Sequence, residues 1–132
     1  MTDREALFQY RIKQARETLA DAELMLAGGS GYRSAVNRAY YAMFYAVLAL
    51  FLRFDFRTKT SKHKGVIAMF DQEFVHTGRA GVGLSRILHR TFELRQDCDY
   101  REFAEISREI AAGAVEHARE FVAAIEAIVP AV

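Results

Sequence analysis

Ala39–Leu52, with the sequence AYYAMFYAVLALFL, is the most apolar stretch of the chain and decides its fold. Arg38 precedes the stretch and Arg53 follows it, so the uninterrupted apolar run has 14 residues. A membrane-spanning helix needs about 20 such residues, and we therefore expect no membrane span. A helix that is apolar nearly all round belongs in the middle of a helical core. The stretch predicts a central, buried helix over about 32–53.

Amphipathic segments flank this helix on both sides. In the first segment, apolar residues recur every three or four positions at Phe8, Ile12, Ala15, Leu19, Ala22 and Leu26. In the last segment, from about 100 to 128, the same spacing relates Ile106, Ile110, Ala114, His117, Phe121 and Ile125. Capping-box pairs precede both stripes, namely Thr2 with Glu5 and Asp99 with Glu102. Two shorter helices are predicted between them, over about 64–76 and 82–96.

Helices alone account for the pattern, because no window alternates with the period of two that a strand requires. The sequence GGSG at 28–31 and the glycines Gly78, Gly81 and Gly83 mark breaks between helices. Long helices joined by short loops pack side by side in opposite directions. We expect an all-α fold in one domain, 1–132, with an antiparallel up-down four-helix bundle and one short additional helix.

Composition excludes several classes of protein. The 132 residues are 52% hydrophobic, which is enough to bury a core, and 18 basic against 17 acidic residues exclude a uniformly basic nucleic-acid binder. Cys98 is the single cysteine, so neither an intramolecular disulfide nor a cysteine-based zinc site can form. No P-loop, dinucleotide-binding fingerprint or histidine pair at helical spacing is present. We expect a cytoplasmic protein with no metal and no cofactor.

Charge is unevenly distributed along the chain. Residues 32–64 hold seven basic residues and one acidic residue, a net charge of +6, whereas residues 96–128 have a net charge of −5. A locally basic segment in a neutral chain favours phosphate binding, and it predicts nucleotide or RNA contacts at Arg57, Lys59, Lys62, His63 and Lys64. The alternatives are a solvated loop, or pairing of the basic middle with the acidic last helix.

Two stretches combine polar and aromatic residues in an unusual way. In NRAYYAMF, residues 37–44, Asn37 and Tyr41 share one helix face and Tyr40 and Phe44 share another. Asn37, Arg38 and Tyr41 then line a groove or satisfy one another inside the bundle. The second stretch is FELRQDCDY, residues 92–100, which is predicted to place an arginine, two aspartates and a tyrosine where one helix ends and the next begins.

These two stretches, together with SKHKG at 61–65, resemble the small stand-alone HEPN-domain proteins of bacteria and archaea, over roughly residues 5–128. The resemblance implies an α-helical bundle, usually a homodimer. It also implies a toxin–antitoxin pair with a minimal nucleotidyltransferase, beside which such proteins are often encoded. Many HEPN members are metal-independent ribonucleases that use an arginine followed, after four to six residues, by a histidine.

The histidine of that motif is missing here. Arg95 matches the family's arginine, but Asp99 and Tyr100 stand where the histidine belongs. Imidazole exchanges protons near neutral pH, whereas an ordinary aspartate is a poor acid there. The prediction is therefore a nucleotide- or RNA-interacting partner of a nucleotidyltransferase without an intact ribonuclease motif. Its binding residues include Asn37, Arg38 and Tyr41, and Arg95, Asp99 and Tyr100 form its candidate catalytic group.

Two alternatives stay open. One is an active endoribonuclease toxin that uses Arg95 with Tyr100 or with a histidine from another loop. Arg57 and His63 have the family's spacing, but they lie at a different place in the chain. The other alternative is a non-catalytic dimerisation module, in which Arg95 pairs with Asp97 or Asp99 and Asp99 caps the last helix.

Overall fold

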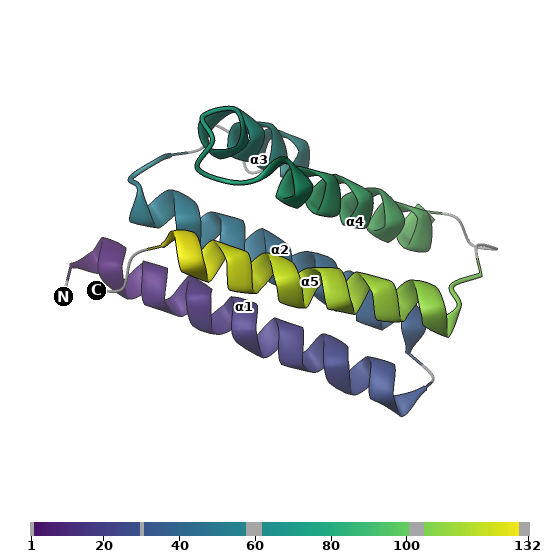
Figure 1. The fold of residues 1–132 in the computed structure, drawn as a ribbon. Helices are drawn as coiled ribbons and strands as arrows, with labels where there is room; N and C mark the ends of the chain where they lie inside the picture. Colours follow the sequence, from purple (N-terminus) through teal and green to yellow (C-terminus); the bar gives the residue numbers. More distant parts are fainter. Residues whose placement is uncertain (1, 30, 58–61, 101–104, 130–132) are drawn as a thin grey trace.

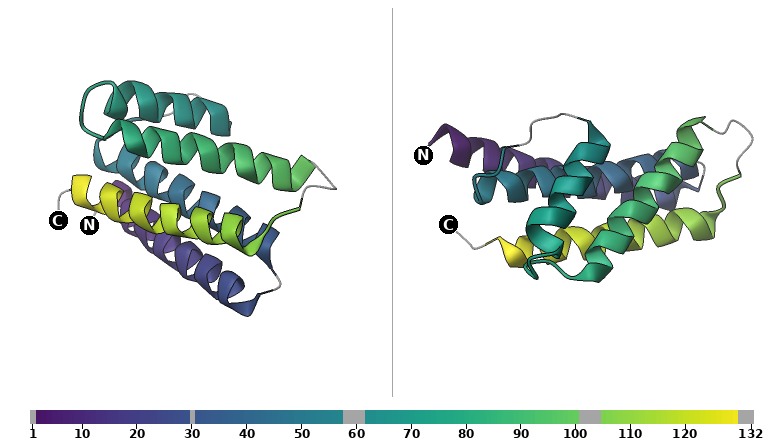
Figure 2. Two further views of the ribbon diagram at one scale, coloured as in Figure 1. Left: turned by 45° about the vertical axis from the view of Figure 1, so that its right-hand side comes forward. Right: turned by 90° about the horizontal axis from the view of Figure 1, so that it is seen from above.

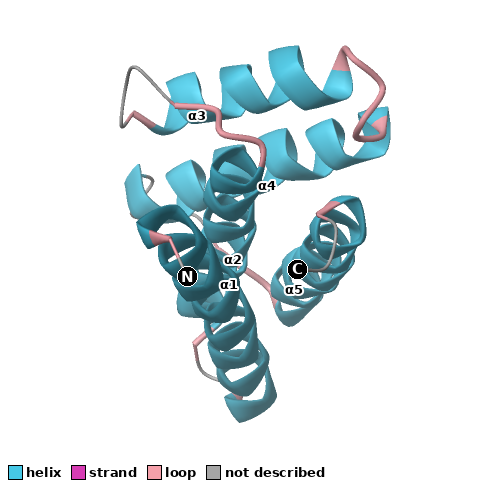
Figure 3. Cartoon of the chain, turned by 90° about the vertical axis from the view of Figure 1, so that its left-hand side faces the viewer, coloured by secondary structure: helices cyan, strands magenta, loops and turns pink. Residues whose placement is uncertain are grey.

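The computed structural model describes residues 2–29, 31–57, 62–100 and 105–129, and all regular structure within them is helical (Figures 1 and 3). The all-α class is therefore confirmed. The elements are α1 (Asp3–Gly28), α2 (Tyr32–Arg53), α3 (His63–Phe70), the π-helical turn η1 (Asp71–Val75), α4 (Val82–Tyr100) and α5 (Arg108–Ile128).

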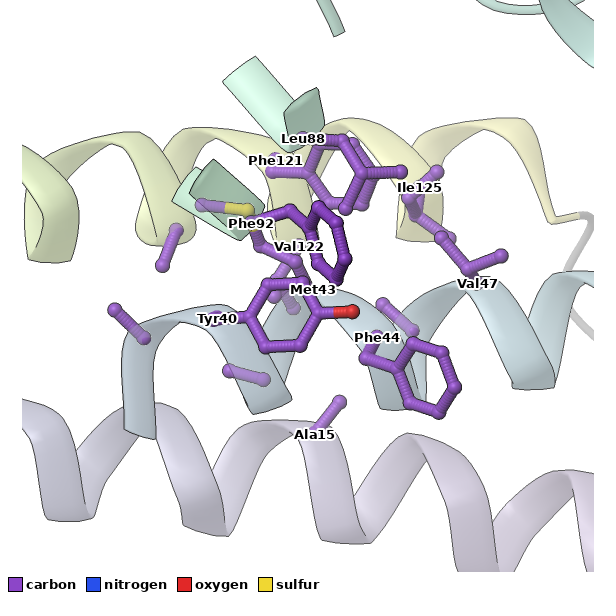
Figure 4. Close-up of a cluster of buried hydrophobic side chains, with 14 of the residues drawn as sticks. Ala15, Tyr40, Met43, Phe44, Val47, Leu88, Phe92, Phe121, Val122 and Ile125 are labelled. Atoms are coloured by element: carbon purple, nitrogen blue, oxygen red, sulfur yellow. The ribbon is translucent and has the colours of Figure 1, made fainter. Parts of the chain in front are cut away.

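Helix α2 is the centre of the fold, as its sequence predicts. It packs against α1, α4 and α5, and Figure 1 shows it between α1 and α4. Its largest fully buried side chains are Tyr40, Met43, Leu50, Val36 and Val47. Alanines at 35, 39, 42, 46 and 49 follow one face and are all fully buried, which permits close helix contacts. Figure 4 shows Tyr40, Met43 and Val47 of α2 between Ala15 of α1 and Phe121, Val122 and Ile125 of α5.

By length and composition, α2 could also cross a membrane, with a mean hydropathy of 1.4. However, 67% of that apolar window is buried inside the protein. Packing against the other helices thus accounts for the apolar character of α2.

The short helix α3 continues into η1 and crosses α2 at a steep angle (Figure 2, right). At the η1 end, the buried Phe74 ring lies 5.9 Å from Phe51 and 5.5 Å from Phe54, measured between ring centroids. Asp71 links η1 to α4 through two contacts. Its carboxylate accepts a hydrogen bond from Ser85 Oγ at 2.7 Å, and it lies 2.7 Å from His89 Nε2. Figure 2 shows this return from η1 into α4. The opposite end of α3, at His63, thereby lies against the first half of α2.

The start of the last helix differs from the sequence prediction. Helix α4 extends to Tyr100, so Asp99 lies in its last turn, and the predicted cap at Asp99 is wrong. Helix α5 begins at Arg108 because Ser107 caps it and accepts a hydrogen bond from the Ile110 amide at 3.1 Å. Ile110 lies in the first turn and is 43% exposed instead of buried. The capping partner suggested for Asp99, Glu102, lies outside the described residues.

Candidate functional site

Helices α2, α3 and α4 bring a group of cationic and aromatic side chains together. We name this group the arginine–tyrosine cluster; it consists of Arg38, Tyr40, Tyr41, Phe44, His63 and Arg95. Its α2 members share adjoining faces of one helix, since they occupy positions 38, 40, 41 and 44. Arg95 comes from the middle of α4, and His63 is the first residue of α3.

Two guanidinium groups share the half-buried ring of Tyr41. The Cζ atoms of Arg38 and Arg95 each lie 5.2 Å from its centroid, within the range of a cation–π contact. The two charges are therefore no further apart than the sum of those distances, and their mutual repulsion is roughly 1 kcal/mol. The two guanidinium groups thus make the surroundings of Tyr41 locally positive.

The partners of Arg38 are neutral. The side-chain oxygen of Asn37 accepts hydrogen bonds from Arg38 Nε at 3.1 Å and from Arg38 Nη2 at 2.8 Å. Asn37 therefore orients the guanidinium over Tyr41 without compensating its charge. The predicted residues Asn37, Arg38 and Tyr41 thus form one connected unit on the first half of α2.

Arg95 is partly compensated by Asp99, one turn later on α4. The Nε atom of Arg95 lies 2.9 Å from Asp99 Oδ2, and the two side chains are 18% and 34% exposed. The Nε–H is not aligned for a hydrogen bond to that oxygen, although the atom itself is buried. The contact is therefore an ion pair of modest strength, and solvent at Asp99 screens it further.

His63 is held by Tyr40 and Phe44. Its Nδ1 shares a 2.7 Å hydrogen bond with the Tyr40 hydroxyl, and its ring stacks on Phe44 with centroids 4.3 Å apart. Burial raises the pKa of Tyr40 well above its usual range, so the hydroxyl stays protonated. Burial and, secondly, the charge of Arg95 lower the pKa of His63. The imidazole is accordingly neutral at pH 7, with its Nδ1 engaged by Tyr40.

The remaining predicted site residues lie elsewhere or at the edge of this cluster. Lys62 and Lys64 are exposed on either side of His63, and Tyr100 ends α4 with 78% of its surface exposed. Arg57 lines a surface hollow of about 300 Å³ with Leu52 and Phe56, beyond the end of α2. That hollow is about 16 Å along α2 from Tyr41, at 1.5 Å per residue. Lys59 lies outside the described residues.

Sequence reasoning assigned Tyr40 and Phe44 to the core and missed their contact with His63. The two residues share a helix face, which indicates that one partner meets both of them. Their partner is 23 residues later than Tyr40, and helix periodicity carries no information over that distance. Phe92 and Arg95 give a similar signal on α4, since they are three residues apart and both approach the Tyr40 ring.

Among the side chains that the structure describes, no group of three or more histidine, cysteine, aspartate or glutamate residues could hold a metal ion. The arginine–tyrosine cluster itself offers two guanidinium cations, a neutral imidazole and a buried phenol. Guanidinium groups bind phosphate through paired hydrogen bonds, and imidazole exchanges protons.

Comparison with known proteins supports the family. The HEPN domain family matches residues 8–128. The chain is a HEPN-domain protein. It is 40% identical over 129 residues to a UPF0332 protein of Thermotoga maritima, which covers 98% of this chain and 96% of that protein. It is 38% identical over 98 residues to the protein named "Putative toxin MJ0142" of Methanocaldococcus jannaschii, over 74% of this chain and 65% of that protein.

A second archaeal relative also matches most of the chain. A UPF0332 protein of Archaeoglobus fulgidus is 32% identical over 114 residues, which is 86% of this chain and 88% of that protein. The HEPN match includes all six residues of the arginine–tyrosine cluster. The resemblance seen in the sequence is thus confirmed, and the site described above lies inside the HEPN domain.

The lowered pKa of His63 predicts that acid destabilises the HEPN fold. Below the ordinary pKa of 6.5 the unfolded chain binds a proton at this residue more readily than the folded protein does. The free energy of unfolding should therefore fall as the pH drops through that value, and His63→Gln should reduce the slope. Urea unfolding at several pH values measures both. His76→Gln, at an exposed position, is the control; equal slopes for wild type and His63→Gln would contradict the prediction.

Proposed function

We propose that this protein is a toxin-type HEPN protein that binds RNA or nucleotides through their phosphate groups at the arginine–tyrosine cluster. The observation that carries the proposal is the sharing of the Tyr41 ring by Arg38 and Arg95. Of these two half-buried guanidinium groups, Arg95 has the carboxylate of Asp99 beside it and Arg38 has the neutral Asn37, and such a pair is well suited to holding an anion. The toxin name of a related archaeal protein agrees with this role.

The surroundings of the cluster favour the same ligand. Lys62 and Lys64 flank His63 and add positive charge at the exposed rim. The carboxylate of Asp99 pairs with Arg95, one of the two arginines of the cluster. The net charge around Tyr41 therefore stays positive. On α5, Glu126 pairs with Arg16 of α1 at 2.6 Å and Glu116 pairs with Arg119, so these two carboxylates already have cationic partners. A phosphate is therefore attracted to the cluster in preference to the rest of this nearly neutral protein.

The proposal includes the context that the HEPN family suggests. We infer a cytoplasmic homodimer that acts with a minimal nucleotidyltransferase in a toxin–antitoxin pair. We also infer that α1, α2, α4 and α5 form an antiparallel up-down four-helix bundle. Family membership supports these points, and cross-linking or light scattering of the purified protein tests the homodimer directly.

Arg95 is the residue whose replacement tests phosphate binding most sharply. We expect Arg95→Ala to weaken the binding of a labelled single-stranded RNA about tenfold, close to the loss of one charge-assisted hydrogen bond. Arg95→Lys should also bind more weakly, since lysine keeps the charge but loses the planar fork. Fluorescence anisotropy at low and moderate salt measures both, and Arg86→Ala, at an exposed position of the same helix, is the matched control.

A purely structural Arg95 gives a different result. In that case the ion pair with Asp99 is its whole role, and Arg95→Ala lowers the melting temperature while the folded variant binds RNA as the wild type does. Absence of RNA and nucleotide binding by the wild-type protein at low salt would instead favour the dimerisation module.

A second candidate function, metal-independent RNA cleavage, is favoured by the position of His63. His63 of α3 contacts the same Tyr40 ring as Arg95, and this supports it as the candidate for the histidine missing from α4. A neutral imidazole accepts a proton from a ribose 2′-hydroxyl, and a guanidinium stabilises the charge that develops on the phosphate. Tyr100 is a weaker partner for Arg95 because its side chain is largely in solvent.

Incubation with RNA in EDTA tests this candidate. Cleavage by the wild type that both Arg95→Ala and His63→Gln abolish, and that Tyr100→Phe leaves unchanged, is the result expected for a ribonuclease built on these residues. Intact RNA in the presence of normal binding contradicts the cleavage candidate and leaves the binding function standing.

A further inference from the structure

The fixed charges of the arginine–tyrosine cluster do not balance a doubly charged ligand. Arg38 and Arg95 contribute two positive charges and Asp99 one negative charge, which leaves a net charge of +1. An internal phosphodiester of RNA carries a single negative charge and is matched by this set. A terminal phosphomonoester carries a charge of about −1.5 to −2 near pH 7, because its second pKa is about 6. Such a ligand needs one more positive charge beside it, because Lys62 and Lys64 are exposed at the rim and solvent screens their charges.

His63 is the group that can supply that charge. Its titratable or charged neighbours are Tyr40 and Tyr41 on α2, Arg95 on α4, and Lys62 and Lys64 directly before and after it in the chain. In the free protein, burial and the charge of Arg95 oppose protonation of the imidazole. A dianion bound at Arg95 screens that guanidinium and attracts a proton to the ring. Phosphate binding and protonation of His63 therefore favour each other.

The contacts of His63 suit the charged form as well as the neutral one. An imidazolium donates from both ring nitrogens, so Nδ1 can donate to the Tyr40 hydroxyl while Nε2 donates to a phosphate oxygen. The Phe44 ring, stacked at 4.3 Å, presents its negative face to the cation. Protonation thus breaks no existing contact of this side chain. Tyr40 acts as a positioning residue, because its hydroxyl fixes the imidazole in both states.

We propose that the arginine–tyrosine cluster selects a terminal phosphomonoester of RNA or of a nucleotide over an internal phosphodiester, and that His63 takes up one proton when this group binds. The inference rests on the phosphate-binding function proposed above. It names the ligand group and assigns His63 to its recognition. Affinity for the monoester accordingly rises as the pH falls toward the ordinary pKa of histidine, until the phosphate itself becomes protonated.

Isothermal titration with two matched probes tests the selection. The probes are uridylyl-uridine with and without a 5′-phosphate, titrated at about pH 7.5, where the monoester is a dianion. We expect the phosphorylated dinucleotide to bind about tenfold more tightly, the effect of one added charge-assisted contact. Heats compared in Tris and HEPES, which differ in ionisation enthalpy, should show proton uptake for this probe and none for the other.

Two histidine variants test whether His63 is the residue that takes up the proton when the ligand binds. His63→Gln should abolish both the preference and the proton uptake, so that the variant binds the two dinucleotides with equal affinity. His76→Gln, at an exposed position on η1's C-terminal side, is the matched control and should behave as the wild type. Because His63 is half-buried, a second measurement needs no variant: the NMR titration of the wild-type His63 ring should show its pKa raised by the phosphorylated dinucleotide.

The outcomes separate this inference from the function on which it rests. Equal affinities for the two dinucleotides, both weakened by Arg95→Ala, overturn the selection and keep the phosphate site. A preference that survives in His63→Gln, or an NMR titration of His63 that the ligand does not change, overturns the role of His63. Failure of both dinucleotides to bind overturns the proposed function itself.

Discussion

The hydrogen bond between Tyr40 and His63 is the contact on which the site depends. The Tyr40 side chain is fully buried in the middle of α2, and its hydroxyl needs a partner there. A buried hydroxyl without one costs about 1–3 kcal/mol. The partner is Nδ1 of His63, at 2.7 Å, so this one contact holds the start of α3 against α2. Arg95 lies over the same tyrosine ring, with its Cζ 5.6 Å from the centroid, and brings α4 to the same point.

The electrostatics of the cluster follow from this arrangement. Because the rings of Tyr40, Tyr41 and Phe44 exclude water, charges near them are screened less than charges on the open surface. The charges of Arg38 and Arg95 therefore interact strongly with any charged group close to Tyr41. The charge of Arg95 also helps to keep His63 neutral. The same contacts that hold the helices together thus place two guanidinium groups around one ring, which is the basis of the proposed anion site.

Local patterns in the sequence predicted the helices and their order, since hydrophobic periodicity is a short-range property. The central helix could be predicted because an apolar run of this length is too short to span a membrane and is typical of a buried core helix. The start of α5 could not, because Asp99 and Ser107 are both good N-caps and the sequence offered no means to choose between them. In the structure Ser107 caps α5, whereas Asp99 lies in the last turn of α4 and pairs with Arg95.

The contacts between residues far apart in the sequence are the part of the site that could not be predicted. Asn37, Arg38 and Tyr41 could be grouped from one helix turn, and Arg95 with Asp99 from another. The approach of His63 to Arg95 joins residues 32 positions apart, which spacing alone does not predict. A formal match to the family's arginine–histidine spacing linked His63 to Arg57, yet Arg57 lies near the far end of α2. Within the basic middle segment, Arg57 thus lies apart from His63, and charge alone does not locate the site.

NMR spectra of the arginine Nε–Hε groups, recorded while uridine 5′-monophosphate is added, test the central claim that a phosphate binds over Tyr41. The account predicts that the signals of Arg38 and Arg95 shift together and reach saturation at the same ligand concentration, while those of the exposed Arg57 and Arg86 stay in place. Shifts confined to Arg57, or no saturable shift at Arg38 and Arg95, would contradict it.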